Sequence, residues 1–97
     1  MKFVFHPDAR NEFIHAIDYY EDCEPFLGYD FALEVHSTIQ NICDFSDAWP
    51  ILDEPIRRCL TRRFPYGVLY SMESGQVFIL AVMPLHRHPD YWKNRLR

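Results

Sequence analysis

The sequence is poor in the residues that build covalent or metal-bound frameworks. Its three cysteines, Cys23, Cys43 and Cys59, are an odd number at wide spacing and include no C-x-x-C pair. This spacing encodes neither a disulfide framework nor a zinc knuckle, and we expect all three to be small buried apolar side chains. A reducing cytoplasm suits such a protein best.

Long apolar runs are also missing. The run VFILAVM at 77–83 is far below the roughly 20 residues that span a bilayer. The first residues, MKFVFHPDAR, lack the apolar core of a signal peptide. We therefore expect a soluble, unprocessed, cytoplasmic protein that does not bind membranes.

Motifs of conventional catalysis are absent as well. The sequence has no Ser-His-Asp order, nucleophile elbow, glycine-rich phosphate loop or HExxH, which excludes standard hydrolase and kinase chemistry as far as motifs can. A chain of 97 residues forms one domain, 1–97, too small for a deep cofactor fold, so no cofactor is expected. His86-x-His88 could be half of a metal site, but no cysteine or carboxylate completes it at zinc-ligand spacing, and we expect no metal.

Charge is distributed unevenly along the chain. The net charge is −4, yet residues 1–48 hold ten acidic side chains against Lys2 and Arg10, whereas residues 49–97 hold eight basic side chains against four acidic ones. Such polarity can create a positive field on one face of an acidic protein, suited to an anionic partner. The alternative is that the two halves simply attract each other.

Hydrophobic periodicity predicts an α+β fold. A short strand precedes a helix that begins at Pro7 and stops near Cys23, because Pro25 disfavours helical geometry at Glu24. A second apolar stripe marks a helix from Gly28 to about Phe45, and DAWPILDEP at 47–55 is expected to be a loop. We predict an antiparallel helical hairpin on one face of a small, mostly antiparallel sheet, whose other face stays partly open. The expected strands are 3–5, 56–63, 66–72 and 77–83.

Four arginines fall within the predicted strand IRRCLTRR at 56–63. Alternation places Arg58 and Arg62 on one face and Arg57 and Arg63 on the other. One interpretation is an edge strand protected by charge against aggregation. The other is an arginine ladder that holds phosphates or carboxylates.

A second cluster lies in the tail PLHRHPDYWKNRLR. Cations alternate there with Tyr91 and Trp92, a composition suited to stacked bases with neutralised phosphates, or to a protein-binding hot spot. His15 and His36 fall in the helices, where we expect surface or packing roles. The basic residues of the tail are Arg87, Lys93, Arg95 and Arg97.

These segments together resemble the RelE/ParE superfamily of type II toxin–antitoxin toxins, most of all its ParE-like branch. The resemblance rests on FHPDARNEFIHAIDYYE, the helix start at Gly28, WPI, RRFPYGVLY and RHPDYW, in the order of the family from about Phe3 to Arg95. It implies a small toxin that is neutralised by a cognate antitoxin, with which it forms a hetero-oligomer. The antitoxin's flexible segment would wrap the helices and sheet.

The resemblance implies two alternative modes of action. ParE-like toxins poison DNA gyrase and have no established chemistry, whereas RelE-like toxins cut mRNA in the ribosome. For a nuclease, His86 or His88 would be base or acid, Tyr91 acid or stacking residue, and Arg62, Arg63 and Arg87 phosphate clamps. RelE-like nucleases are lysine-rich, and this chain has only Lys2 and Lys93, which favours gyrase. The expected partner-binding residues are Arg57, Arg58, Arg62, Arg63, Arg87, Tyr91 and Trp92.

The tail departs from the family pattern at two positions. Relatives commonly carry histidine where this chain has Pro84 and arginine where it has His86. A third hypothesis is therefore an inactive remnant that only binds antitoxin. Pro84 should also end the last strand, because it lacks a backbone donor. For the antitoxin, we expect an acidic or amphipathic segment that covers the basic half and the sheet edge, by strand addition or as a helix in a groove.

Overall fold

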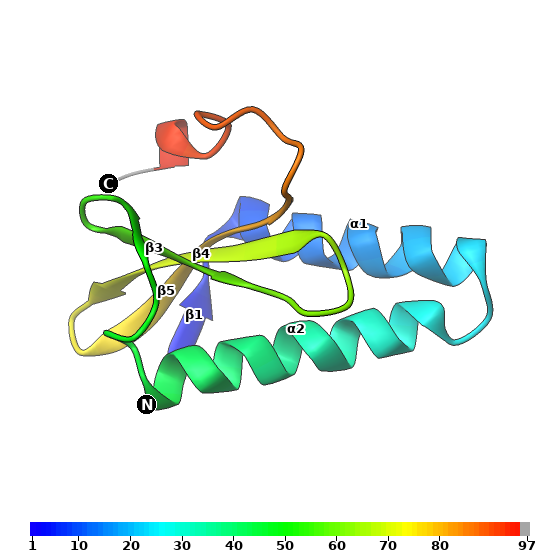
Figure 1. The fold of residues 1–97 in the computed structure, drawn as a ribbon, viewed down its shortest axis with the longest axis horizontal. Helices are drawn as coiled ribbons and strands as arrows, with labels where there is room; N and C mark the ends of the chain where they lie inside the picture. The colour runs from blue at the N-terminus through cyan, green and yellow to red at the C-terminus, as the bar shows by residue number, and fades with distance from the viewer. Residues whose placement is uncertain (96–97) are drawn as a thin grey trace.

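The computed structural model describes residues 1–95, so Arg97 lies outside the described residues. It is an α+β fold in which two helices pack on a five-stranded sheet (Figure 1). The predicted fold class is confirmed. The elements are β1 Phe3–Phe5, α1 Pro7–Cys23, α2 Leu27–Asp44, β2 Ile51–Asp53, β3 Ile56–Leu60, β4 Tyr66–Glu73, β5 Gln76–Pro84 and a 3-10 helix Lys93–Arg95.

The sheet is mixed, with strand order β1-β5-β4-β3-β2. Only β1 runs parallel to its neighbour β5, and every other pair is antiparallel. The two longest strands, β4 and β5, are joined at Ser74 and Gly75, whose φ angles of 52° and 77° form a tight turn. The apolar run at 77–83 is therefore an interior strand, as its composition predicts.

The helical hairpin has the boundaries that its sequence predicts. Pro7 occupies the first turn of α1, where its missing N–H costs nothing, and the His6 side chain accepts the N–H of Asp8 at 3.0 Å. The helices cross closely at Gly28, where a Cβ would lie 2.5 Å from the Ile17 carbonyl oxygen. Glycine is required there because no larger residue fits against that backbone.

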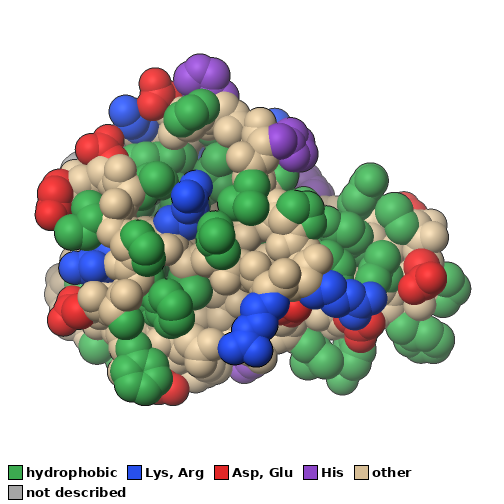
Figure 2. All heavy atoms as spheres, in the orientation of Figure 1, with side chains coloured by type: hydrophobic (Ala, Val, Ile, Leu, Met, Phe, Trp, Pro, Cys, Tyr) green, Lys and Arg blue, Asp and Glu red, His purple; other side chains and the backbone are tan. Residues whose placement is uncertain are grey.

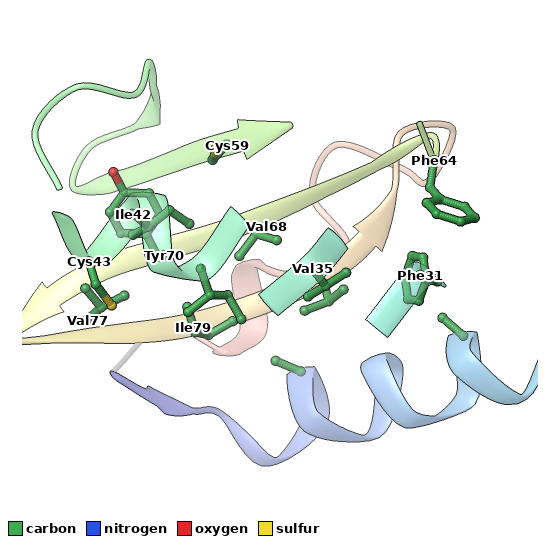
Figure 3. Close-up of a cluster of buried hydrophobic side chains, with 14 residues drawn as sticks. Phe31, Val35, Ile42, Cys43, Cys59, Phe64, Val68, Tyr70, Val77 and Ile79 are labelled. Carbon is green, nitrogen blue, oxygen red and sulfur yellow. The ribbon is translucent and has the colours of Figure 1, made fainter. Parts of the chain in front are cut away.

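The main core lies between the hairpin and the sheet. Figure 3 shows Val35 and Ile42 of α2 on the side of the helix that faces the sheet residues Val68 and Ile79, while Phe31 of the same helix lies beside Phe64. Phe64 is 6 % exposed, and the other five residues are at most 1 % exposed. The apolar side chains that recur about every 3.6 residues along α2 thus pack in one layer against the alternate apolar side chains of the strands.

A second, smaller core covers the opposite face of the sheet. Trp92, only 1 % exposed, packs there against Leu69, Leu80 and Met83. Figure 1 shows the C-terminal segment crossing the sheet on the side away from the hairpin. This face is less open than predicted, because the tail has enough apolar surface to close it.

Three local expectations were wrong. The third strand ends at Leu60 rather than at residue 63, because Thr61 turns the chain by donating its hydroxyl to the Phe64 and Tyr66 carbonyls. Residues 51–53 of the expected loop form β2, a short edge strand with exposed side chains. Cys23 is exposed, whereas Cys43 and Cys59 are buried, and burial raises the pKa of the Cys59 thiol to about 11.

Replacement of Trp92 tests the second core. Trp92→Ala should lower the free energy of unfolding by about 3–5 kcal/mol, because a fully buried indole leaves a cavity. Urea denaturation followed by circular dichroism measures this. The control is Tyr29→Ala, since Tyr29 is 62 % exposed and its removal should cost less than about 1 kcal/mol. Equal costs for the two variants would show that the tail does not complete the core.

Candidate functional site

The loop between β3 and β4 presents two of the predicted arginines. Glu34 on α2 accepts the backbone N–H of Arg63 at 2.9 Å and that of Phe64 at 3.4 Å. Asp30, one turn earlier, pairs with the Arg63 guanidinium at 3.1 Å. The helix thus fixes the loop, and Arg62 projects into solvent with no ion-pair partner among the described residues.

The outer edge of β3 is open at Leu60. Thr61 donates its N–H to Tyr66 of β4, so alternation along the strand directs the N–H groups of Arg58 and Leu60 outward. That of Arg58 meets the Pro50 carbonyl at 3.1 Å. β2 pairs only with Ile56 and Arg57, so none of the described strands covers the edge at Leu60.

Apolar side chains surround this open edge. We define the edge surface as Leu33, Ile51, Leu52 and Leu60, which are 41–50 % exposed, with Arg58 and Arg62 beside them. Between α2 and β3 it is hollowed into a groove of about 620 Å³. The groove is lined by Asp30, Leu33, Glu34, Ser37, Thr38, Asn41, Trp49, Cys59, Leu60, Arg62 and Arg63.

A cleft of about 110 Å³ lies on the opposite face, between the sheet and the tail. Arg58 and Arg87 both line it, above an apolar wall that includes Trp92. Arg58 reaches the cleft across Gly67, where an added Cβ would lie 3.0 Å from the Arg58 Cδ. Because Gly67 has no side chain, the Arg58 side chain can cross over it to the cleft.

The Tyr91 ring lies close to two guanidinium groups. Arg87 is 4.7 Å and Arg95 4.9 Å from its centroid, within range of cation–π attraction. Arg95 is otherwise internal: its guanidinium binds both Glu12 carboxylate oxygens at 2.8 and 2.6 Å and the Leu80 carbonyl at 3.2 Å. The hydrogen bonds that Arg95 donates to Glu12 raise the pKa of Arg95, and these contacts anchor the tail to α1.

The remaining candidates are dispersed. His86 and His88 are exposed in the turn after β5, and His88 accepts the N–H of Asp90. Arg57 donates to the Asp47 and Trp49 carbonyls at 3.2 and 2.6 Å, which fixes the loop before β2. Trp92 is in the core. Arg62 and Arg63 line the groove beside α2, and Arg87 lines the cleft beyond the sheet.

The two charged halves of the sequence are partly paired in the fold. Two arginines pair across the halves, Arg63 with Asp30 in an exposed ion pair and Arg95 with Glu12 in a buried one, whereas Lys93 pairs with Asp53 and Asp90 of its own half. Among residues 1–95, Arg58, Arg62 and Arg87 have no carboxylate partner. On the face of the molecule that Figure 2 draws, basic side chains are spaced among hydrophobic ones rather than gathered into one patch. On the basic half, where Arg57 is held by backbone carbonyls, the cations available to a partner are thus these three; Lys2 and Arg10 of the acidic half also form no ion pair within residues 1–95.

The sequence predicted a partner at the sheet edge and the arginines beside it, but not the apolar residues of the edge surface. β2 was not expected either, because 47–55 was predicted to be a loop. One sequence signal could have indicated this surface. Ile51 and Leu52 lie between Pro50 and Pro55, and prolines in or near a strand mark the edge of a sheet, so these apolar residues could be expected at an exposed edge. No three potential metal-ligating side chains converge within residues 1–95, and none of the helices in that part of the chain could cross a membrane.

The fold is shared with a solved structure described as the chromosomal ParDE TA system from P. aeruginosa. The likeness has a TM-score of 0.60 at 15 % identity, over 87 % of this chain and 95 % of that chain. No protein-family model matches the sequence, and no curated protein matches it significantly. The chain therefore has the RelE/ParE fold, and the sequence resemblance is confirmed at the level of the fold.

The anchor between tail and helix is testable with two carboxylates of α1. Glu12→Ala should lower the free energy of unfolding by about 3–5 kcal/mol, because the buried Arg95 guanidinium loses the carboxylate that it binds through two hydrogen bonds. Asp8→Ala is the control: Asp8 is 3.7 Å from Arg95 but half-exposed, so its loss should cost about 1 kcal/mol or less. Denaturant titration measures both, and equal effects would contradict the assignment of Glu12 as the anchor.

Proposed function

We propose that this protein is the toxin of a type II toxin–antitoxin system, a cytoplasmic growth inhibitor neutralised by an antitoxin encoded beside it. The observation that carries the proposal is the fold, shared over most of both chains with a ParDE TA system structure. The edge surface supports a protein partner, because it combines an open strand edge, exposed aliphatic side chains and unpaired cations. Such a surface is suited to strand addition by an extended segment.

We further propose that the toxin acts by binding DNA gyrase and performs no chemistry. General acid–base cleavage needs a base, an acid and a cation within reach of one reacting group. His86, Arg87 and His88 lie together in the exposed turn after β5, whereas Arg62 and Arg63 lie in the groove beside α2, away from them. This dispersal supports a contact surface over a nuclease site.

A second candidate is a ribosome-dependent mRNA endoribonuclease. One observation favours it: Arg58 and Arg87, both without a carboxylate partner among residues 1–95, line the same cleft, with Tyr91 4.7 Å from Arg87. Two guanidinium groups could hold a phosphate bidentately. Arg58, which sequence reasoning assigned only to partner binding, would then replace Arg62 and Arg63 as the clamp.

The function is tested by inducing the chain without its antitoxin. We expect growth arrest, inhibited supercoiling by purified gyrase, and trapped cleavage complexes. Gyrase that keeps full activity, together with mRNA cuts inside reading frames by primer extension, would favour the nuclease instead. Harmless expression with tight antitoxin binding would indicate the remnant, and Pro84→His with His86→Arg should then restore toxicity.

The electrostatic part of antitoxin binding is tested with Arg58→Ala combined with Arg62→Ala. Affinity for the antitoxin should fall by about tenfold at about 0.1 M salt, where the Debye length is about 10 Å. The loss should be smaller at about 1 M salt, which screens these exposed charges. Titration calorimetry at both salt concentrations measures this, with Arg10→Ala as a control on the exposed face of α1. Equal losses at both concentrations would show that the contacts are not mainly electrostatic.

A further inference from the structure

The tip of the helical hairpin holds an aromatic ring in an unfavourable backbone conformation. Phe26, between α1 and α2, has a φ of 72°, in the left-handed region that glycine adopts without steric cost. Its side chain is 75 % exposed, the most exposed among the large hydrophobic residues described. Within residues 1–95, the packing of the Phe26 side chain compensates neither for the strain of its backbone nor for the exposure of its ring.

The surrounding residues hold this tip rigidly. The Glu21 carboxylate reaches back from the last turn of α1 and accepts the N–H of Phe26 at 2.9 Å and that of Gly28 at 3.1 Å. Gly28 in turn allows the two helices to meet closely, as the 2.5 Å approach to Ile17 shows. The ring is therefore presented on an ordered backbone, and its immobilisation on binding costs little entropy.

The charged side chains of the tip itself are all acidic, and the Arg63 guanidinium near the start of α2 is already paired with Asp30. No lysine or arginine occurs between Asn11 and Ile56. Asp22 and Glu24 flank the tip, are exposed, and form no ion pair within residues 1–95. Figure 2 shows the hairpin protruding from the body of the molecule, its far end covered by hydrophobic and acidic side chains. Such a surface repels nucleic acid phosphates.

We propose that the tip, defined as Asp22, Glu24 and Phe26, is the contact that captures the toxin's target protein. Phe26 inserts into an apolar pocket on that protein, and lysine or arginine residues around the pocket pair with Asp22 and Glu24. The antitoxin segment, expected to be acidic or amphipathic, covers the edge surface, and an acidic segment is repelled by the tip. The inference rests on the proposed function, because it assigns a surface to the capture of a protein target.

Phe26→Gly separates a binding role from a structural one. This change removes the ring and relieves the left-handed strain, so the melting temperature should stay the same or rise. The concentration of toxin that half-inhibits purified gyrase should rise by about tenfold or more, as for loss of an aromatic anchor. Growth arrest should weaken in parallel, and antitoxin affinity should stay within about twofold of the unmodified protein.

The matched control is Phe45→Ser. Phe45 is also an exposed phenylalanine, at 63 %, but it caps the opposite end of α2, and its replacement should leave inhibition unchanged. Asp22→Lys combined with Glu24→Lys should also weaken inhibition, and this loss should be largest at low salt and shrink as salt is added, because like charges would then face each other across the contact.

The growth and binding measurements distinguish failure of the inference about the tip from failure of the proposed function. If the unmodified chain arrests growth and Phe26→Gly arrests it equally, the inference about the tip is overturned and the proposed function stands. A Phe26→Gly variant that loses antitoxin affinity would also overturn it, because the tip would then belong to the antitoxin interface. If the unmodified chain does not arrest growth, the proposed function fails and the inference fails with it.

Discussion

The fold depends on closing both faces of a sheet whose two central strands are buried. Val77 to Val82 of β5 are at most 2 % exposed, so neither face of this strand can remain in water. The hairpin covers one face through its apolar stripes, and the tail covers the other through Trp92. The ion pair between Glu12 and Arg95 joins the hairpin to the tail across the edge of the sheet. Glu12 also accepts the backbone N–H of Val82 in β5.

Long periodic segments were predictable, and short irregular ones were not. The boundaries of α1 and α2 follow from Pro7, Pro25 and the apolar stripes, since helix period and proline geometry are local properties. The end of β3 at Leu60 depends on side-chain hydrogen bonds of Thr61, which no period announces. β2 has three exposed residues and forms only because β3 lies beside it, a tertiary effect.

The candidate site was predictable by residue type but not by position. The sequence identified the arginines, and their number in 56–63 does mark the exposed border of the sheet. Which of them remain available was decided by tertiary partners: Asp30 engages Arg63, backbone carbonyls engage Arg57, and Glu12 engages Arg95. Charge polarity along the chain is thus partly an internal attraction, as one interpretation predicted, and the remaining arginines leave the interpretation as a partner-binding surface a prediction.

The place of the tail in the core has a consequence for biosynthesis. The helix that receives Arg95, α1, is synthesised long before that arginine, and β5 ends at Pro84, shortly before Trp92. Until Trp92 has been added, one face of the sheet is bare and apolar, so a nascent chain or one truncated before Trp92 lacks the second layer that lies beside Arg87 and its cleft. Closure of the sheet therefore waits for the segment that carries Trp92 and Arg95.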